Sequence, residues 1–402
     1  MTKKWQTILW LALAEFLAMS LWFSASAVTA TLAKVWHLDA GGTAWLTMSV
    51  QIGFVVGAFL SALFNVADVW PPRFVFAIGA FLGATANGLI PLLSDGFTSA
   101  VVLRFITGFA LAAVYPVGMK IMATWMKEDR GFGIGLLVGA LVLGSASPHL
   151  IRAWGGINDW QIVMYTASGL ALLAGVIGLL VGNLGPYQAA PAPFRWKYLL
   201  ETINNQGIRL ANFGYFGHMW ELYAFWSWLA LFLTESYRLG GVSNFETVAS
   251  LMTFFVIGIG GLGSLLAGWL ADWWGRSYIT ILSMTISGTA AIIIGFFFGK
   301  SPILVSIIAL IWGFAVVADS AQFSTAVSEL ADRTYMGTAL TIQTSLGFLL
   351  TLVSIRLIPV LVDWVGWQYA FAVLAFGPLF GIWAMWTLKQ SPVALRLAGG
   401  RG

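Results

Sequence analysis

The chain has 402 residues, of which 59% are hydrophobic and 9% are charged, and its formal net charge is +4. Soluble globular proteins carry about 25% charged residues, so this composition excludes a soluble fold and predicts an integral membrane protein. The chain contains no cysteine, which excludes disulfides and thiolate chemistry. The positive charge is attributed to basic loops, and no nucleic acid is expected as a partner.

Apolar stretches of about 20 residues, the length that crosses the hydrocarbon of a bilayer, recur along the whole chain. The first begins at Trp5, after two lysines, and is longer than the apolar core of a cleaved signal peptide. Short polar breaks therefore predict twelve membrane-spanning helices. They cover residues 6–32, 44–66, 74–94, 98–124, 132–153, 160–182, 209–235, 247–271, 278–299, 303–329, 338–362 and 367–388.

One long connection, residues 183–207, separates the sixth and seventh predicted spans. It contains three prolines, followed over residues 194–203 by the pattern of an amphipathic helix that lies at the membrane surface. We therefore predict an N-terminal part of six helices, residues 1–182, and a C-terminal part of six helices, residues 208–402. Lysines and arginines are concentrated in the loops on one side, which predicts that both chain ends and the linker are cytoplasmic.

Two pairs of similar segments stand six predicted spans apart, as in transporters built from two related halves. Glu15-Phe-Leu-Ala-Met-Ser-Leu-Trp22 has Glu, Ala and Trp at the same spacing as Glu221-Leu-Tyr-Ala-Phe-Trp-Ser-Trp228. Gly108-Phe-Ala in the fourth span likewise matches Gly313-Phe-Ala in the tenth. The shared register predicts an internal duplication.

The predicted loop after the eighth span reads Gly268-Trp-Leu-Ala-Asp272-Trp-Trp-Gly275-Arg276. This motif resembles the signature loop of the major facilitator superfamily, Gly-x-Leu-x-Asp-x-x-Gly-Arg, at every defined position. In the loop after the second span, Asp68 and Arg73 match the same pattern, whereas two prolines replace the glycine and a basic residue.

The resemblance implies an all-α membrane fold of two six-helix bundles that rock about a central cavity, with loops that gate the cycle. The gating residues implied are Asp68, Arg73, Gly268, Asp272, Gly275 and Arg276. Independently of the family, an aspartate at a helix end can bridge to a nearby arginine and interact with helix dipoles, which would favour one conformational state. The alternative is a tight turn with solvated charges.

Ionisable side chains inside predicted spans are candidates for function, because each costs a few kcal/mol to insert into a membrane. Six of them stand out: Glu15, Arg104, Lys120, His218, Glu221 and Asp319. The resemblance implies that their helices line the central cavity. Carboxyl and imidazole groups there can take up and release protons, so Glu221 with His218, one helical turn earlier, is predicted to couple transport to protons or to bind substrate. A structural ion pair with a basic residue is the alternative.

Other candidates for the cavity are polar or aromatic. Glu15 corresponds to Glu221 in the first half, and Gln322 lies in the polar stretch that begins at Asp319. Arg104 and Tyr115 are eleven residues apart and can share one helix face, so Arg104 could bind an anion or pair with a carboxylate. Lys120 could contact substrate or extend to the cytoplasmic surface. Trp22 and Trp228 could wall the pocket.

These residues predict a secondary active transporter in which alternating access moves a small anion together with a proton. An exporter of metal cations or amphipathic compounds is an alternative, as is a transporter-like sensor or an intramembrane enzyme, although HExxH and GxSxG motifs are absent. The expected protein is not an enzyme and needs no cofactor or resident metal. It is expected to act as a monomer among membrane lipids, as a multi-pass protein of a bacterial inner (plasma) membrane.

Overall fold

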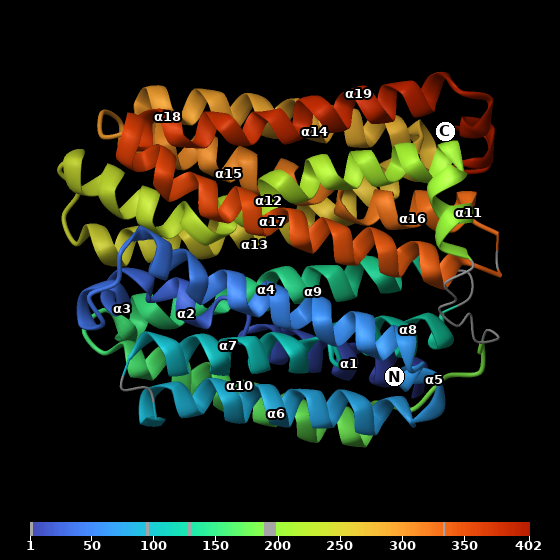
Figure 1. Ribbon diagram of the computed structural model, residues 1–402, viewed down its shortest axis with the longest axis horizontal. Helices are drawn as coiled ribbons and strands as arrows, with labels where there is room; N and C mark the ends of the chain where they lie inside the picture. Colours follow the sequence, from blue (N-terminus) through green and yellow to red (C-terminus); the bar gives the residue numbers. More distant parts are fainter. Residues whose placement is uncertain (1–2, 94–95, 127–129, 189–197, 333) are drawn as a thin grey trace. The chain divides into compact units, whose positions relative to one another are not determined.

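The structure is a computed structural model that describes residues 3–93, 96–126, 130–188, 198–332 and 334–402. These residues fold into helices joined by short turns, which confirms the predicted all-α class (Figure 1). The chain forms two compact units. Unit 1 comprises Met1–Ala189 and Ser227–Gly258, and unit 2 comprises Ala190–Trp226 and Ile259–Gly402.

Unit 1 contains the first ten helices and a π-helical turn. They are α1 (Lys3–Met19), α2 (Ser24–Ala27), α3 (Thr29–Val35), α4 (Ala40–Leu63), α5 (Val66–Val69), α6 (Pro72–Leu93), α7 (Phe97–Leu111), α8 (Tyr115–Trp125), α9 (Arg130–Ile151), η1 (Arg152–Gly156) and α10 (Trp160–Val181). The long helices α12 (Gln206–Leu239) and α13 (Phe245–Trp274) belong partly to each unit.

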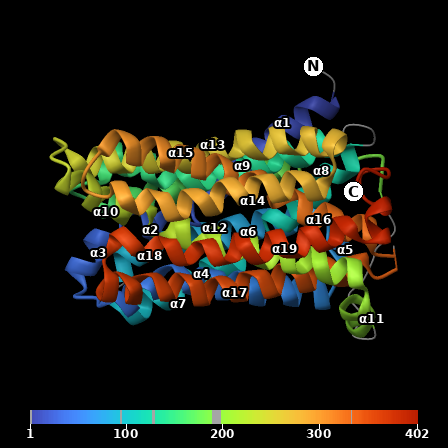
Figure 2. The same cartoon turned by 90° about the horizontal axis from the view of Figure 1, so that it is seen from above.

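Unit 2 contains α11 and all the helices that follow α13. They are α11 (Tyr198–Asn204), α14 (Arg276–Ile293), η2 (Ile294–Phe297), α15 (Pro302–Ala318), α16 (Ser320–Leu330), α17 (Met336–Val365), α18 (Trp367–Ala370), η3 (Phe371–Ala375), α19 (Phe376–Gln390) and η4 (Pro392–Arg396). The helices α14, α15 and α19 lie side by side in this unit (Figure 2).

In the described part of the chain, ten helical stretches are long and apolar enough to cross a membrane, and each corresponds to a predicted span. The other two predicted spans are helical as well. Residues 209–235 lie within α12, whose polar side chains make it less apolar than the others. Residues 6–32 are divided among α1, α2 and α3.

Close approach of helix backbones holds unit 1 together. Gly53 of α4 lies against the carbonyl oxygen of Phe105 on α7, and Gly108 of α7 lies against that of Val50 on α4, so a Cβ atom at either position would clash. Small residues of this kind allow helices in membranes to pack by van der Waals contact.

Large apolar side chains remain exposed on the outer helix faces, as expected where lipid is the solvent. Examples are Ile78, Leu180, Leu262, Trp269, Ile303 and Phe376.

The predicted amphipathic helix of the linker is represented by α11, which crosses the direction of α12 (Figure 1). Its apolar residues Leu200 and Ile203 are exposed, whereas Tyr198 packs against Tyr335 of unit 2 with ring centroids 5.9 Å apart. An exposed apolar face fits the predicted position at the membrane surface. The preceding part of the linker, residues 189–197, lies outside the described residues.

Candidate functional site

Glu221, near the middle of α12, is buried and held by two neutral donors in unit 2. The indole nitrogen of Trp312 on α15 donates to Oε1 at 2.7 Å, and the hydroxyl of Ser287 on α14 donates to Oε2 at 2.8 Å. Trp312 in turn stacks on Phe225 with ring centroids 3.9 Å apart, which fixes its orientation. Because both partners are neutral, the carboxyl group can change its charge by binding a proton without breaking an ion pair.

His218 belongs to a second buried group in the same unit. Its Nδ1 lies 2.8 Å from Oδ1 of Asp319, and its Nε2 lies 2.9 Å from the hydroxyl of Ser320. Asp319 is placed there by an interruption of the tenth predicted span, since α15 ends at Ala318 and α16 begins at Ser320. The structure therefore divides the predicted pair of His218 and Glu221: His218 contacts Asp319, and Glu221 contacts Ser287 and Trp312.

Arg104 on α7 is fully buried in unit 1 and ties α7 to the interruption in the first span. Its guanidinium donates to the carbonyl oxygens of Leu21 at 2.9 Å, Trp22 at 2.5 Å and Leu46 at 3.3 Å. It also donates to the hydroxyl of Ser24 at 3.1 Å and to Oδ1 of Asn87 at 3.2 Å. All five acceptors are neutral, so these bonds orient the guanidinium without neutralising it. The alternative that Arg104 pairs with a carboxylate is not supported by these contacts.

Glu15 on α1 is also fully buried in unit 1. A Cβ atom on Gly118 of α8 would lie 2.7 Å from its Oε2, so the glycine makes room for the carboxyl group. Neither carboxyl oxygen accepts a hydrogen bond from the residues that the structure describes. Tyr115, one helical turn before Gly118, is close enough for an electrostatic interaction with Glu15. Glu15 is thus a third buried acidic residue, after Glu221 and Asp319, and it lies in the unit that holds Arg104.

The two predicted pocket tryptophans are both buried in unit 1. Trp22 packs against Phe54 of α4 with ring centroids 4.9 Å apart. Trp228 lies in the part of α12 that belongs to unit 1, whereas Glu221 on the same helix belongs to unit 2.

Lys120 of α8 lies at the first of the two predicted gating loops. Its ammonium group forms an ion pair with Asp68 of α5 and donates to the carbonyl oxygen of Ala67 at 2.5 Å. Arg73 contacts Asn183 instead, at 3.4 Å. Asp68 of the first predicted gating loop is therefore bound by Lys120 from a different helix. From the sequence, Lys120 was expected to contact substrate or to extend to the cytoplasmic surface.

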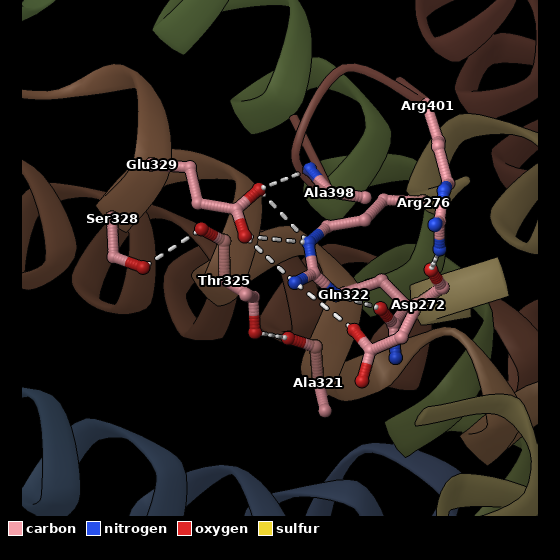
Figure 3. A network of polar contacts seen from close by, with 9 residues as sticks. All are labelled: Asp272, Arg276, Ala321, Gln322, Thr325, Ser328, Glu329, Ala398 and Arg401. Carbon is pink, nitrogen blue, oxygen red and sulfur yellow. Dashed lines mark hydrogen bonds and ion pairs between the residues drawn. The ribbon is translucent and has the colours of Figure 1, made fainter. Parts of the chain in front are cut away.

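The second predicted gating loop is organised around Arg276 (Figure 3). Its guanidinium binds both carboxylate oxygens of Glu329 at 2.7 to 3.0 Å, and it donates to Oε1 of Gln322 at 3.0 Å. Oδ1 of Asp272 lies 3.4 Å away. Gly275 has φ +90°, a conformation that side chains disfavour, which explains the glycine at this position of the motif.

Three residues that contact the candidate site were not predicted from the sequence: Ser287, Trp312 and Glu329. Gln322 was predicted to lie in the substrate cavity, and in the structure its Oε1 accepts from Arg276, which was predicted to act in gating. Among the described residues, Nε2 of Gln322, at 4.0 Å, is the only atom that an added Cβ atom on Gly268 would approach. The periodicity of apolar residues and the spacing of motifs could not reveal these contacts, because each contact joins residues that are distant in the sequence.

Residues 11–354 match the profile described as Major Facilitator Superfamily. The chain belongs to the major facilitator superfamily. It is therefore an integral, multi-pass membrane protein and a secondary transporter. The resemblance noted for the signature loop is confirmed.

Relatives within the superfamily include the hexuronate transporter of Escherichia coli K12, which is 23% identical over 386 residues that cover 87% of each chain. The D-galactonate transporter of E. coli O6:H1 is 22% identical over 261 residues, 55% of this chain and 58% of that protein. Among solved structures, the nucleoside transporter NupG aligns with a TM-score of 0.74 at 16% identity, covering 96% of this chain and 100% of that one. The xylose transporter XylE of E. coli aligns with a TM-score of 0.72 at 14% identity, covering 96% and 99%. These structural likenesses show the superfamily fold.

In this superfamily member, Glu329→Gln is expected to change the rate of interconversion between conformational states far more than Asp272→Asn. The Glu329 contact is bidentate and its side chain is 26% exposed, whereas the Asp272 side chain is 63% exposed. Exposed ion pairs contribute about 0–1 kcal/mol, so we expect less than about fivefold for Asp272→Asn. For Glu329→Gln we expect about a hundredfold, because the largely buried Arg276 loses its bidentate carboxylate and keeps only the more distant, exposed carboxylate of Asp272. Distances between labels on paired introduced cysteines would follow the exchange, and the reverse order of effects would contradict this assignment.

Proposed function

We propose that this transporter imports a small sugar acid together with a proton, by alternating access. The observation that carries the proposal is the charge of Arg104, which is buried among five neutral acceptors. A buried cation whose acceptors among the described residues are all neutral creates a positive potential around it, which favours a carboxylate nearby. The names of two relatives, which transport hexuronate and D-galactonate, support the same substrate class.

In this proposal Glu221 carries the coupled proton, and Glu15 is a second buried carboxyl group that can bind one. Glu221 is bound by neutral donors, and neither oxygen of Glu15 is paired within the described residues. Either carboxyl group can therefore gain or lose a proton without displacing a cation. His218 and Asp319 form the neighbouring pair that would respond to the charge of Glu221. Tyr115, Trp22 and Trp228 are assigned to the substrate pathway.

The proposal also includes the membrane arrangement. Twelve spans form two six-helix bundles, residues 1–182 and 208–402, that are joined by the linker 183–207. Both chain ends face the cytoplasm, and the protein acts as a monomer in a bacterial inner membrane. Two sets of ionic contacts gate the transport cycle: the pair Asp68–Lys120 and the network Asp272–Arg276–Glu329.

Transport into proteoliposomes tests the proposed function directly. Radiolabelled glucuronate and galactonate are added outside, with and without an inward proton gradient. We expect accumulation that requires the gradient, that a protonophore abolishes, and that unlabelled sugar acids but not neutral hexoses inhibit. Uptake at the same rate in protein-free liposomes, or transport only of divalent metals or lipophilic cations, would refute the proposal.

A further inference from the structure

The segment Ser391–Gly402, which follows α19, folds back onto the signature loop of unit 2. Leu397 within it is fully buried and Ala394 nearly so, which anchors the segment against the helices. From this anchor the chain contacts two members of the Arg276 network (Figure 3). The residues of Ser391–Gly402 that make these contacts are neither among the candidate substrate residues nor part of the signature motif.

The first contact is made by the backbone of Ala398. Its N–H donates to Oε2 of Glu329 at 3.1 Å, while the same carboxylate is bound by Arg276. Ala398 has φ +47°, and the two glycines after it also have positive φ. This left-handed turn is unfavourable for alanine. Its contact with Glu329 therefore compensates part of the conformational cost.

The second contact is made by Arg401. Its Nη1 donates to the backbone carbonyl oxygen of Asp272 at 2.5 Å, and its guanidinium lies 5.8 Å from the ring centroid of Trp273. Gly275 also lies directly against the backbone of Arg401, where a Cβ atom would clash with the carbonyl oxygen. The segment thus contacts the loop at three successive places: Asp272, Trp273 and Gly275.

On the basis of the gating role proposed above, we propose that Ser391–Gly402 is a third component of the gate, in which the Ala398 amide and Arg401 are positioning groups for Glu329 and for the Asp272 loop. The amide holds the Glu329 carboxylate in the orientation that binds Arg276 with both oxygens. Arg401 holds the end of α13, so Asp272 is fixed through its backbone even though its side chain is mostly exposed. Displacement of the segment would loosen the loop and weaken the Arg276–Glu329 ion pair together.

Hydrogen–deuterium exchange of the purified full-length protein tests this without any substrate. Arg401→Ala and Ala398→Pro are expected to accelerate exchange of the amides in residues 271–276 by about tenfold, the effect of losing one charge-assisted hydrogen bond in the local structure. Proline at 398 removes the N–H and requires negative φ. The matched controls are Ala398→Gly, which retains the N–H and tolerates positive φ, and Arg396→Ala, which removes the same charge from an exposed position of the segment. Both controls should exchange as wild type.

A merely structural contribution is separated from positioning by two further variants. Arg401→Lys should restore most of the protection, because lysine keeps a charged donor for the Asp272 carbonyl. In a Glu329→Gln background, Ala398→Pro should add little, since the carboxylate that it positions is gone. Unchanged exchange in Arg401→Ala and Ala398→Pro, equal acceleration by Arg396→Ala, or full additivity with Glu329→Gln would overturn the proposal.

Discussion

Glu221→Gln is expected to abolish accumulation driven by a proton gradient while leaving counterflow exchange of the substrate largely intact. The amide oxygen of glutamine can still accept from Trp312, seen at 2.7 Å, and its NH2 group can donate to the Ser287 hydroxyl, seen at 2.8 Å, but glutamine cannot carry a proton through the cycle. If one proton accompanies one monovalent anion, a gradient of about one pH unit supports about tenfold accumulation. We expect the variant to reach a ratio of about one in proteoliposomes.

Glu235→Gln on the same helix is the matched control, because Glu235 is partly exposed and pairs locally with Arg238. It should accumulate substrate as wild type does. Loss of counterflow as well as accumulation in Glu221→Gln would assign the residue to substrate binding or to the structure instead of to proton coupling.

Replacement of Arg104 has the other large expected effect. Arg104→Gln should reduce transport about a hundredfold and lower the free energy of unfolding by ~3 kcal/mol, because several buried acceptors lose a charged donor. Arg104→Lys should not restore either property, since one ammonium group cannot reach the carbonyl oxygens of Leu21, Trp22 and Leu46 with the geometry of a guanidinium. Uptake in proteoliposomes and thermal unfolding in detergent measure the two effects.

Arg238→Gln, in which the arginine is half-exposed, provides the control and should change neither property strongly. If Arg104→Gln unfolds as wild type and still transports, the charge of Arg104 is not part of the anion site. If the folded fraction of Arg104→Gln in proteoliposomes, assayed at a temperature well below its unfolding transition, still fails to transport the anion, the proposed attraction for the anion is supported.

The helical class and most of the spans could be predicted because their cause is local. Runs of apolar residues between polar breaks place the ten membrane-crossing stretches within a few residues of their positions in the structure. The interruption after Met19 was not predictable in this way, since no proline or glycine stands there. One cause is Arg104, which lies 82 residues after Trp22 and donates a hydrogen bond to its carbonyl oxygen. The other is the pair of hydroxyls of Ser20 and Ser24, which donate to nearby backbone carbonyl oxygens.

The residues of the candidate site could be predicted from the sequence only in part. The acidic residues Glu15, Glu221 and Asp319 could be selected because charge inside an apolar span is costly. The residues that contact them could not be predicted, because these contacts join distant helices. Trp312 resembles any other tryptophan of an apolar helix, and its role depends on the approach of α15 to α12. Glu329 is 53 residues from Arg276, and their ion pair depends on how α14 and α16 are packed.

The break between α1 and α2 has a mechanical consequence. Bending a continuous helix such as α4 would rupture its internal ladder of hydrogen bonds, and each lost bond would oppose the motion. At Leu21 and Trp22 the carbonyl oxygens are already directed to a side chain on α7, whose long aliphatic stem can follow a change of angle. We therefore expect bending of the first span at Leu21 and Trp22 to cost less than bending of α4, while α1 keeps Glu15 in place.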